Sequence, residues 1–236
     1  MKAMHRIHVA VCPAAAACVA LIVGSATAQD AQQLVSPRWM VEIKGGDFEP
    51  DLDSYQLFYG DDEARHLSAA FAYRFRPWLE IGAEIGGIRE EGVGLLAAEA
   101  VPGGEVTYTL MPLHVVLNLR GVFRQNQLIV PYLGVGFSAA YYKQDIELQS
   151  DRTGTSALGG TVRAGLQLSL NRWDPDARSG YGEGEVKRSF FFVEAQRFTT
   201  EQGDTELGGD LVLLGFRFEF GKDARLSSAR DKAKGQ

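Results

Sequence analysis

The sequence predicts an all-β fold, an eight-stranded antiparallel up-and-down transmembrane β-barrel. Three observations predict it: strand-length segments alternate apolar and polar residues, an export signal precedes them, and all three tryptophans fall at one end of the predicted barrel. In the last segment, Phe216, Phe218 and Phe220 share one strand face. Arg217 and Glu219 share the other. A transmembrane barrel turns such aromatic residues toward lipid and the charges inward. Because soluble sheets also alternate, a periplasmic soluble barrel or sandwich is the alternative.

Residues 1–28 have the features of a secretory signal peptide. Lys2 and Arg6 supply a positive start, an apolar run covers 9–23, and an A-x-A cleavage site ends at residue 28. The run is short for a membrane span, so we expect cleavage rather than an uncleaved anchor. The sequence therefore predicts an exported chain that begins with a polar lead-in at 29–38.

Cysteine content and charge narrow the class of the exported chain. Cys12 and Cys18 both lie in the predicted signal, so the exported chain has no cysteine and no disulfide. A lipoprotein site at Cys18 is disfavoured because the apolar run continues past it to Val23. Removing Lys2 and Arg6 from 24 basic residues leaves 22 against 30 acidic ones, a net charge of about −8 that argues against nucleic-acid binding. No later apolar run reaches the roughly 18 residues of a membrane helix, so any membrane crossing must use strands.

Eight strand-like segments make up the predicted barrel at 39–220. Their approximate bounds are 39–48, 66–76, 78–88, 106–123, 128–144, 157–172, 188–198 and 207–220. Four connections are long and acidic, namely 49–65, 89–105, 145–156 and 199–206. The links at 76–78 and 124–127 are short, and the link at 173–187 is longer, with space for a single helical turn. Long outer loops and short periplasmic turns are typical of outer-membrane barrels, and an even strand number puts both ends in the periplasm.

One face of each segment is apolar, and we expect this face to lie outside. In the first four segments it comprises Val41 and Ile43; Leu67, Ala69, Phe71, Tyr73 and Phe75; Leu79, Ile81, Ala83 and Ile85; and Leu113, Val115, Leu117 and Leu119. In the next three it comprises Ile129, Leu133, Val135 and Phe137; Val162, Ala164, Leu166 and Leu168; and Val193 and Ala195. The opposite face is rich in Gly, Ser and Ala, as the crowded interior of a narrow barrel requires.

The three tryptophans indicate where one membrane interface lies along the predicted barrel. Trp39 opens the first segment, Trp78 follows the first short turn, and Trp173 follows the sixth segment. All three places are periplasmic in the predicted topology. Because tryptophan favours the membrane interface, we interpret them as interface aromatics.

Four stretches carry a resemblance to a known class of proteins: 39–53, 110–113, 130–136 and 190–196. With them the chain resembles the small outer-membrane β-barrels of Gram-negative bacteria, of the broad OmpA, OmpX and OmpW type. More narrowly, it resembles a group of such barrels known mainly from myxobacteria and their relatives. The resemblance implies location in the outer membrane and handling by the outer-membrane assembly machinery.

The end of the barrel is similar to the assembly signal of this class. The signal is carried here by Phe216, Phe218 and Phe220. In the class the chain usually stops at the last aromatic residue, whereas here residues 221–236 follow, with a net charge of +3. We expect this basic tail to lie in the periplasm, where it touches anionic lipid or is disordered.

Charged residues on the inward faces form the candidate site. They are Glu42, Lys44, Arg74, Arg76, Glu80, Glu84, Arg120, Arg163, Glu194, Arg217 and Glu219. Five acids nearly balance six bases, and unpaired charges in so narrow a lumen would be costly, so we expect them to pair. We favour a polar plug that replaces a hydrophobic core over an ion path gated by the same pairs.

We expect no catalytic site, cofactor or metal. His66 and Ser68 have the spacing of a lipid A deacylase pair, yet they point inward and not toward lipid. His114 is a lone lining residue, and Asp51-x-Asp53 lacks the rest of a calcium-loop pattern. The predicted role is therefore structural or surface-interacting, for a monomer in contact with outer-membrane lipids and lipopolysaccharide. A narrow porin-like channel and a lipid A-modifying enzyme are the alternatives.

Overall fold

The computed structural model describes residues 37–51, 64–96, 101–124, 127–146, 152–172, 186–202 and 205–221. The chain divides into two units, 1–34 and 35–236, and all described residues belong to the second. The predicted signal peptide, most of the lead-in, Trp173, the predicted helical turn and the basic tail beyond Gly221 lie outside the described residues.

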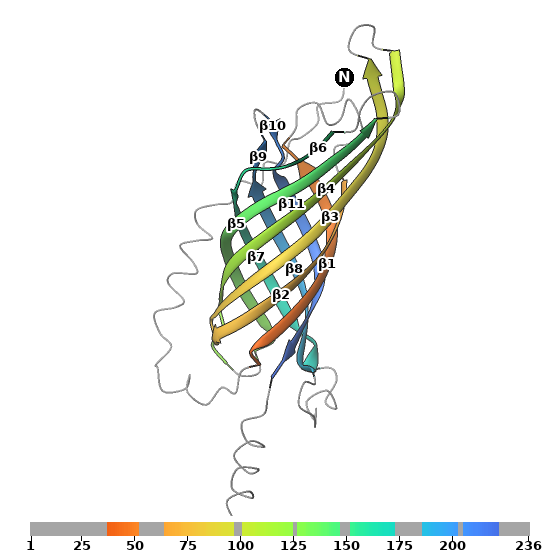
Figure 1. Cartoon of the computed structure of the whole chain (residues 1–236). Helices are drawn as coiled ribbons and strands as arrows, with labels where there is room; N and C mark the ends of the chain where they lie inside the picture. Colours follow the sequence, from red (N-terminus) through yellow and green to blue (C-terminus); the bar gives the residue numbers. More distant parts are fainter. Residues whose placement is uncertain are drawn as a thin grey trace, which may run out of the picture. The chain divides into compact units, whose positions relative to one another are not determined.

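Eight long antiparallel strands form a closed barrel, which confirms the predicted fold (Figure 1). They are β1 (Trp39–Pro50), β2 (Ala64–Arg76), β3 (Leu79–Leu96), β4 (Val101–Arg120), β5 (Ile129–Ile146), β7 (Gly159–Ser169), β8 (Val186–Thr199) and β11 (Gly209–Phe220). Each pairs with the next, and β11 pairs with β1 to close the sheet. The short elements are β6 (Arg152–Thr155), which pairs with β5, η3 (Leu170–Arg172), and the hairpin of β9 (Glu201–Gln202) and β10 (Thr205–Glu206). No helix in the described ranges is long and apolar enough to cross a membrane, a finding that has no bearing on strands.

The strand register gives the barrel a narrow lumen. Followed from Met40 through each neighbouring strand in turn, the register returns to β1 at Pro50, ten residues along. A shear of ten over eight strands tilts them by roughly 40°, within the range typical of barrels. Eight strands at this tilt leave an interior that side chains can fill.

The barrel is apolar outside, and the part of its lumen toward the chain ends is polar, as predicted. On β11 the side chains of Arg217 and Glu219 are buried, whereas the side chain of Phe216, directly before Arg217, is half exposed. Leu166 on β7 is 56% exposed, and its neighbour Gln167 is 1% exposed. Apart from Arg76, the same orientation holds for the predicted outward and inward sets on the other strands.

The outward apolar belt has a sharp edge at each end. Toward the loops it stops at a row of outward polar residues on seven strands: Asp47, Arg65, Arg89, Thr109, Lys143, Arg197 and Asp210. Within this row, Asp47 pairs in register with Arg65, Thr109 pairs with both Arg89 and Lys143, and Arg197 pairs with Asp210. At the other end Trp39 lies 5.2 Å from the Phe71 ring and 4.6 Å from the Tyr73 ring, and Trp78 is exposed. On β4 the belt runs from Met111 to Leu119, about the nine residues that a tilted transmembrane strand needs.

Two predictions about strand ends and strand faces are wrong. Residues 89–105 were expected to form a loop, but β3 and β4 continue as a paired hairpin whose last pair is Leu96 with Val101. Arg76 was expected in the lumen, but its side chain is exposed. The register shifts between Arg74 and Arg76 at the tight turn, so strict alternation from β2 ends before Arg76.

Candidate functional site

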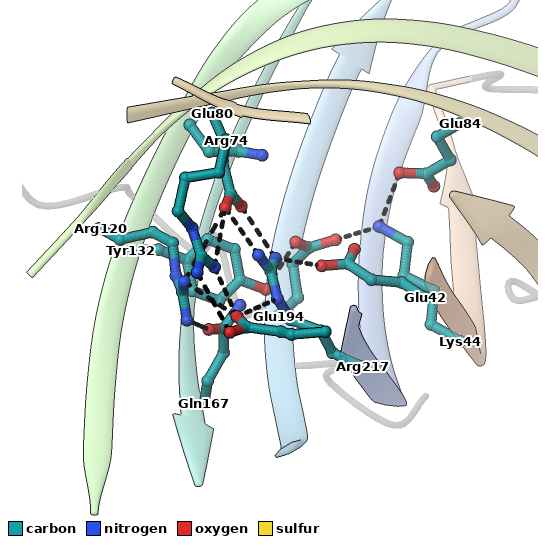
Figure 2. A network of polar contacts seen from close by, with 12 residues as sticks. Glu42, Lys44, Arg74, Glu80, Glu84, Arg120, Tyr132, Gln167, Glu194 and Arg217 are labelled. Atoms are coloured by element: carbon teal, nitrogen blue, oxygen red, sulfur yellow. Dashed lines mark hydrogen bonds and ion pairs between the residues drawn. The ribbon is translucent and has the colours of Figure 1, made fainter. Parts of the chain in front are cut away.

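Six charged residues gather at the end of the lumen where β1 begins and β11 ends (Figure 2). We call this the first charge cluster: Arg74, Arg120 and Arg217 with Glu42, Glu80 and Glu219. Arg217 lies at its centre, because its guanidinium bonds Glu42 at 2.6 Å, Glu80 at 2.6 Å and Glu219 at 3.1 Å. Arg74 and Arg120 both reach Glu219, at 2.5 and 3.0 Å.

Four more charged residues form the second charge cluster, one step nearer the loops. They are Lys44, Arg163, Glu84 and Glu194. Each cation contacts both acids: Lys44 bonds Glu194 and lies 2.8 Å from Glu84, and Arg163 lies 3.0 Å from Glu84 and 3.6 Å from Glu194. The residues come from β1, β3, β7 and β8, so the cluster spans the lumen.

Each cluster is electrically neutral. The first holds three cations and three anions, and the second holds two of each. The excess base expected from the sequence was Arg76, which lies outside the lumen network. Burial of a charge is costly unless ion pairs and hydrogen bonds replace its hydration, so this balance is what makes a charged lumen compatible with stable folding.

Uncharged residues complete the bonding of the clusters, and their part in it was missed by sequence reasoning. Tyr132 donates its hydroxyl to Glu194 at 2.6 Å, Arg120 donates to Gln167 at 2.6 Å, and Arg163 donates to Asn118 at 2.9 Å. The Arg120 guanidinium also lies 5.5 Å from the centre of the Phe190 ring, a cation–π distance. The inward register of these residues was visible in the sequence, but their choice of partner depends on strands far apart in the chain.

Inward-facing glycines make room for the large side chains. A Cβ on Gly165 would overlap the Tyr132 ring, and one on Gly134 would overlap Asn118 and Arg163. The inner face therefore accommodates the clusters because glycines leave space beside the large side chains.

The loop end of the lumen is apolar, which corrects the expectation that paired charges replace the core throughout. A buried apolar cluster there comprises Phe48, Ala64, Ile88, Tyr108, Leu110, Ala140, Phe198, Leu211 and Leu213. The rings of Phe48 and Phe198 stack 5.6 Å apart. From the end where β1 begins toward the loops, the lumen thus contains the first charge cluster, the second charge cluster and then the apolar cluster.

His66, Ser68 and His114 lie between the second charge cluster and the apolar cluster. On β2, His66 and Ser68 follow Ala64 of the apolar cluster, and on β4 His114 lies midway between Leu110 of that cluster and Asn118. All three side chains are buried and face inward. In the described part of the chain, no three His, Cys, Asp or Glu residues are arranged to hold a metal ion.

Comparison with solved structures reveals the same fold in two outer-membrane proteins. Neisserial surface protein A matches with a TM-score of 0.52 and 14% identity, over 77% of this chain and 97% of that one. The outer membrane protein OprG from Pseudomonas aeruginosa matches with a TM-score of 0.51 and 15% identity, over 79% and 98% of the two chains. No protein-family model and no curated protein matches the sequence. The chain therefore shares the closed eight-stranded barrel of small outer-membrane proteins.

Proposed function

We propose that this chain is an outer-membrane β-barrel protein of a Gram-negative cell, with a closed lumen and a structural or surface-interaction role. The observation that carries the proposal is the inverted distribution of polarity: apolar side chains cover the outside while ten charged ones are buried inside. In water this arrangement would expose the apolar belt and gain nothing from burying ions. In a bilayer both features are favourable.

The layered lumen supports a closed barrel rather than a channel. The two charge clusters are cross-linked by ion pairs between strands on opposite walls, and the apolar cluster adds a layer without fixed charge. An ion would have to break these pairs and then cross a dehydrated apolar section. We therefore place function on the outside of the barrel and on its loops.

Outer-membrane lipids and lipopolysaccharide are the proposed contacts of the outer surface, with the chain as a monomer. The polar row beside the belt offers both signs of charge to lipid headgroups, with Arg65 and Arg89 exposed near Asp47. Arg197 bonds Asp51 at 2.9 Å and Asp210 at 2.8 Å, which links β8, β11 and the end of β1 at the same level. The outer-membrane assembly machinery is the proposed partner during insertion.

Fractionation of an expressing Gram-negative cell tests the location. We expect the chain in the outer-membrane fraction, and we expect its gel mobility to change on boiling, because a folded barrel resists detergent until heated. A chain recovered in the soluble periplasm with no heat-dependent mobility would contradict the proposal.

Two further measurements separate the closed barrel from its alternatives. In planar bilayers we expect no steady conductance, and a steady open state lost on Glu84→Gln or Arg120→Gln would indicate a channel instead. The buried, inward position of His66 and Ser68 supports a non-enzymatic role, since a deacylase pair must reach lipid. A lipid A mass profile that changes between the wild type and Ser68→Ala would contradict that role.

A further inference from the structure

Six neighbouring buried polar atoms, on the loop side of the second charge cluster, have no hydrogen-bond partner within the described part of the protein. They are both ring nitrogens of His66, both ring nitrogens of His114, Ser68 Oγ and Glu84 Oε1. Their residues are 1–4% exposed, so bulk solvent does not reach them. A concentration of unbonded polar atoms in one place requires an explanation, because folded proteins satisfy nearly all such groups.

The four residues form one continuous patch on the wall made by β2, β3 and β4. Ser68 pairs in register with Gly86, and Glu84 pairs with His114. The His66 ring lies directly over Gly86, since its Cε1 and Nε2 are the nearest atoms to a Cβ built there. The atoms therefore face a shared part of the lumen and not four separate sites.

The neighbouring layers cannot supply the missing partners. On one side, Lys44 and Arg163 already bond the other oxygen of Glu84 at 2.8 and 3.0 Å. On the other side the apolar cluster begins, and the His114 ring packs edge-on against Phe198 at 5.1 Å. Among the residues that the structure describes, neither imidazole has a protein donor or acceptor within hydrogen-bonding distance.

We infer that this patch is an internal binding site for water, a small hydrated chamber within the lumen. Water suits the set because it donates to Glu84 Oε1 and to an unprotonated ring nitrogen, and accepts from a ring N–H or from the Ser68 hydroxyl. A bound water typically makes about three hydrogen bonds to buried groups, so a few molecules satisfy all six atoms. The second charge cluster then contacts water on the side that faces the loops, and the apolar cluster separates this water from the loop end of the barrel.

The direction of a stability change tests the inference. A buried Ser68 hydroxyl without any hydrogen bond would destabilise the fold, so its removal in Ser68→Ala would stabilise the protein. A urea midpoint above that of the wild type would therefore overturn the proposal. A hydroxyl bonded to water contributes favourably, and we expect the midpoint to stay unchanged or fall. Ser138→Ala is the matched control, because Ser138 Oγ donates directly to Gly160 O at 3.1 Å and must lower the midpoint.

Magnetic resonance tests the water itself. His5 and His8 lie in the predicted signal peptide, so the exported chain carries only His66 and His114 and histidine labelling gives two rings. We expect magnetisation transfer from water to both rings in the barrel purified from membranes, and none to Phe48 in the apolar cluster. His66→Gln and His114→Gln assign the signals. Absence of transfer to both rings, or ring nitrogens bonded to a protein group, would overturn the proposal.

Discussion

Arg217 on β11 and Glu80 on β3 face each other across the lumen and share two parallel hydrogen bonds, at 2.8 and 2.6 Å. Strands β1 and β2 separate the two in the sheet, so the bonds tie walls that the backbone ladder does not join. Bidentate arginine–carboxylate pairs are among the strongest polar contacts in proteins. This pair holds the first charge cluster together.

Loss of the Arg217 charge should weaken the barrel strongly. Arg217→Met leaves Arg74 and Arg120 against three carboxylates, and removal of one partner from a buried ion cluster costs about 3–5 kcal/mol. The free energy of unfolding in urea from lipid vesicles, followed by gel mobility, measures the loss. Adding Glu80→Gln restores neutrality and should recover part of it.

Arg76→Met is the matched control for that measurement. The Arg76 side chain is exposed beyond the register shift, so its loss should change stability by no more than about 0.5 kcal/mol. Equal effects of the Arg217 and Arg76 variants would show that the first charge cluster does not stabilise the fold.

A charge on the belt should be penalised according to its depth. Leu117 faces outward near the middle of the belt on β4, and Thr107 faces outward on the same strand beyond the belt edge. In a bilayer Leu117→Arg should cost about 2–4 kcal/mol and Thr107→Arg about 0–1 kcal/mol. Unfolding from vesicles measures both. A soluble barrel would tolerate the two substitutions equally.

A methyl group at Gly165 should disturb the second charge cluster. It would overlap Tyr132, whose hydroxyl bonds Glu194, and overpacking of this kind costs about 1–3 kcal/mol. Gly87→Ala is the control, because nothing lies within 4 Å of a Cβ at Gly87 and the substitution should be neutral or stabilising. Equal urea midpoints for the two variants would contradict the fit between inner glycines and cluster residues.

The alternation of side chains made most of the fold predictable. On the outer surface of a membrane barrel, every second residue must be apolar. The alternating apolar residues from Leu113 to Leu119, and those in the other segments, therefore reveal both the strand and its outward face. The inward charges follow from the same register. Pairing was expected from the near balance of acids and bases, and the structure supplies the partners.

The rest depends on contacts that sequence spacing does not encode. Beyond the belt edge, outward residues such as Arg89 and Glu91 need not be apolar, so the hydrophobicity signal of β3 and β4 disappears where the strands continue. The run from Leu211 to Leu214 has apolar residues on both faces, so alternation could not show that Leu211 and Leu213 belong to an apolar cluster inside the barrel. Arg76 was misplaced because a turn shifted the register by one residue.

The last strand makes a separate prediction about assembly. Phe220 ends β11 and pairs in register with Trp39, at the seam that closes the barrel. Phe220→Ala should lower the amount of chain in the outer membrane, whereas deletion of 221–236 should leave it intact. Immunoblots of membrane fractions measure both, and wild-type levels of the Phe220 variant would contradict the role given to the terminal aromatic residues.

The central claim is that the outward faces contact lipid, and spin labels on single cysteines test it most directly. The exported chain is predicted to lack cysteine, so Leu214→Cys and Glu91→Cys each give one labelled site on an outward face. In vesicles, the label at 214 should collide readily with oxygen and rarely with a water-soluble nickel complex, and the label at 91 should do the reverse. Free access of the nickel complex to the label at 214 would contradict the account.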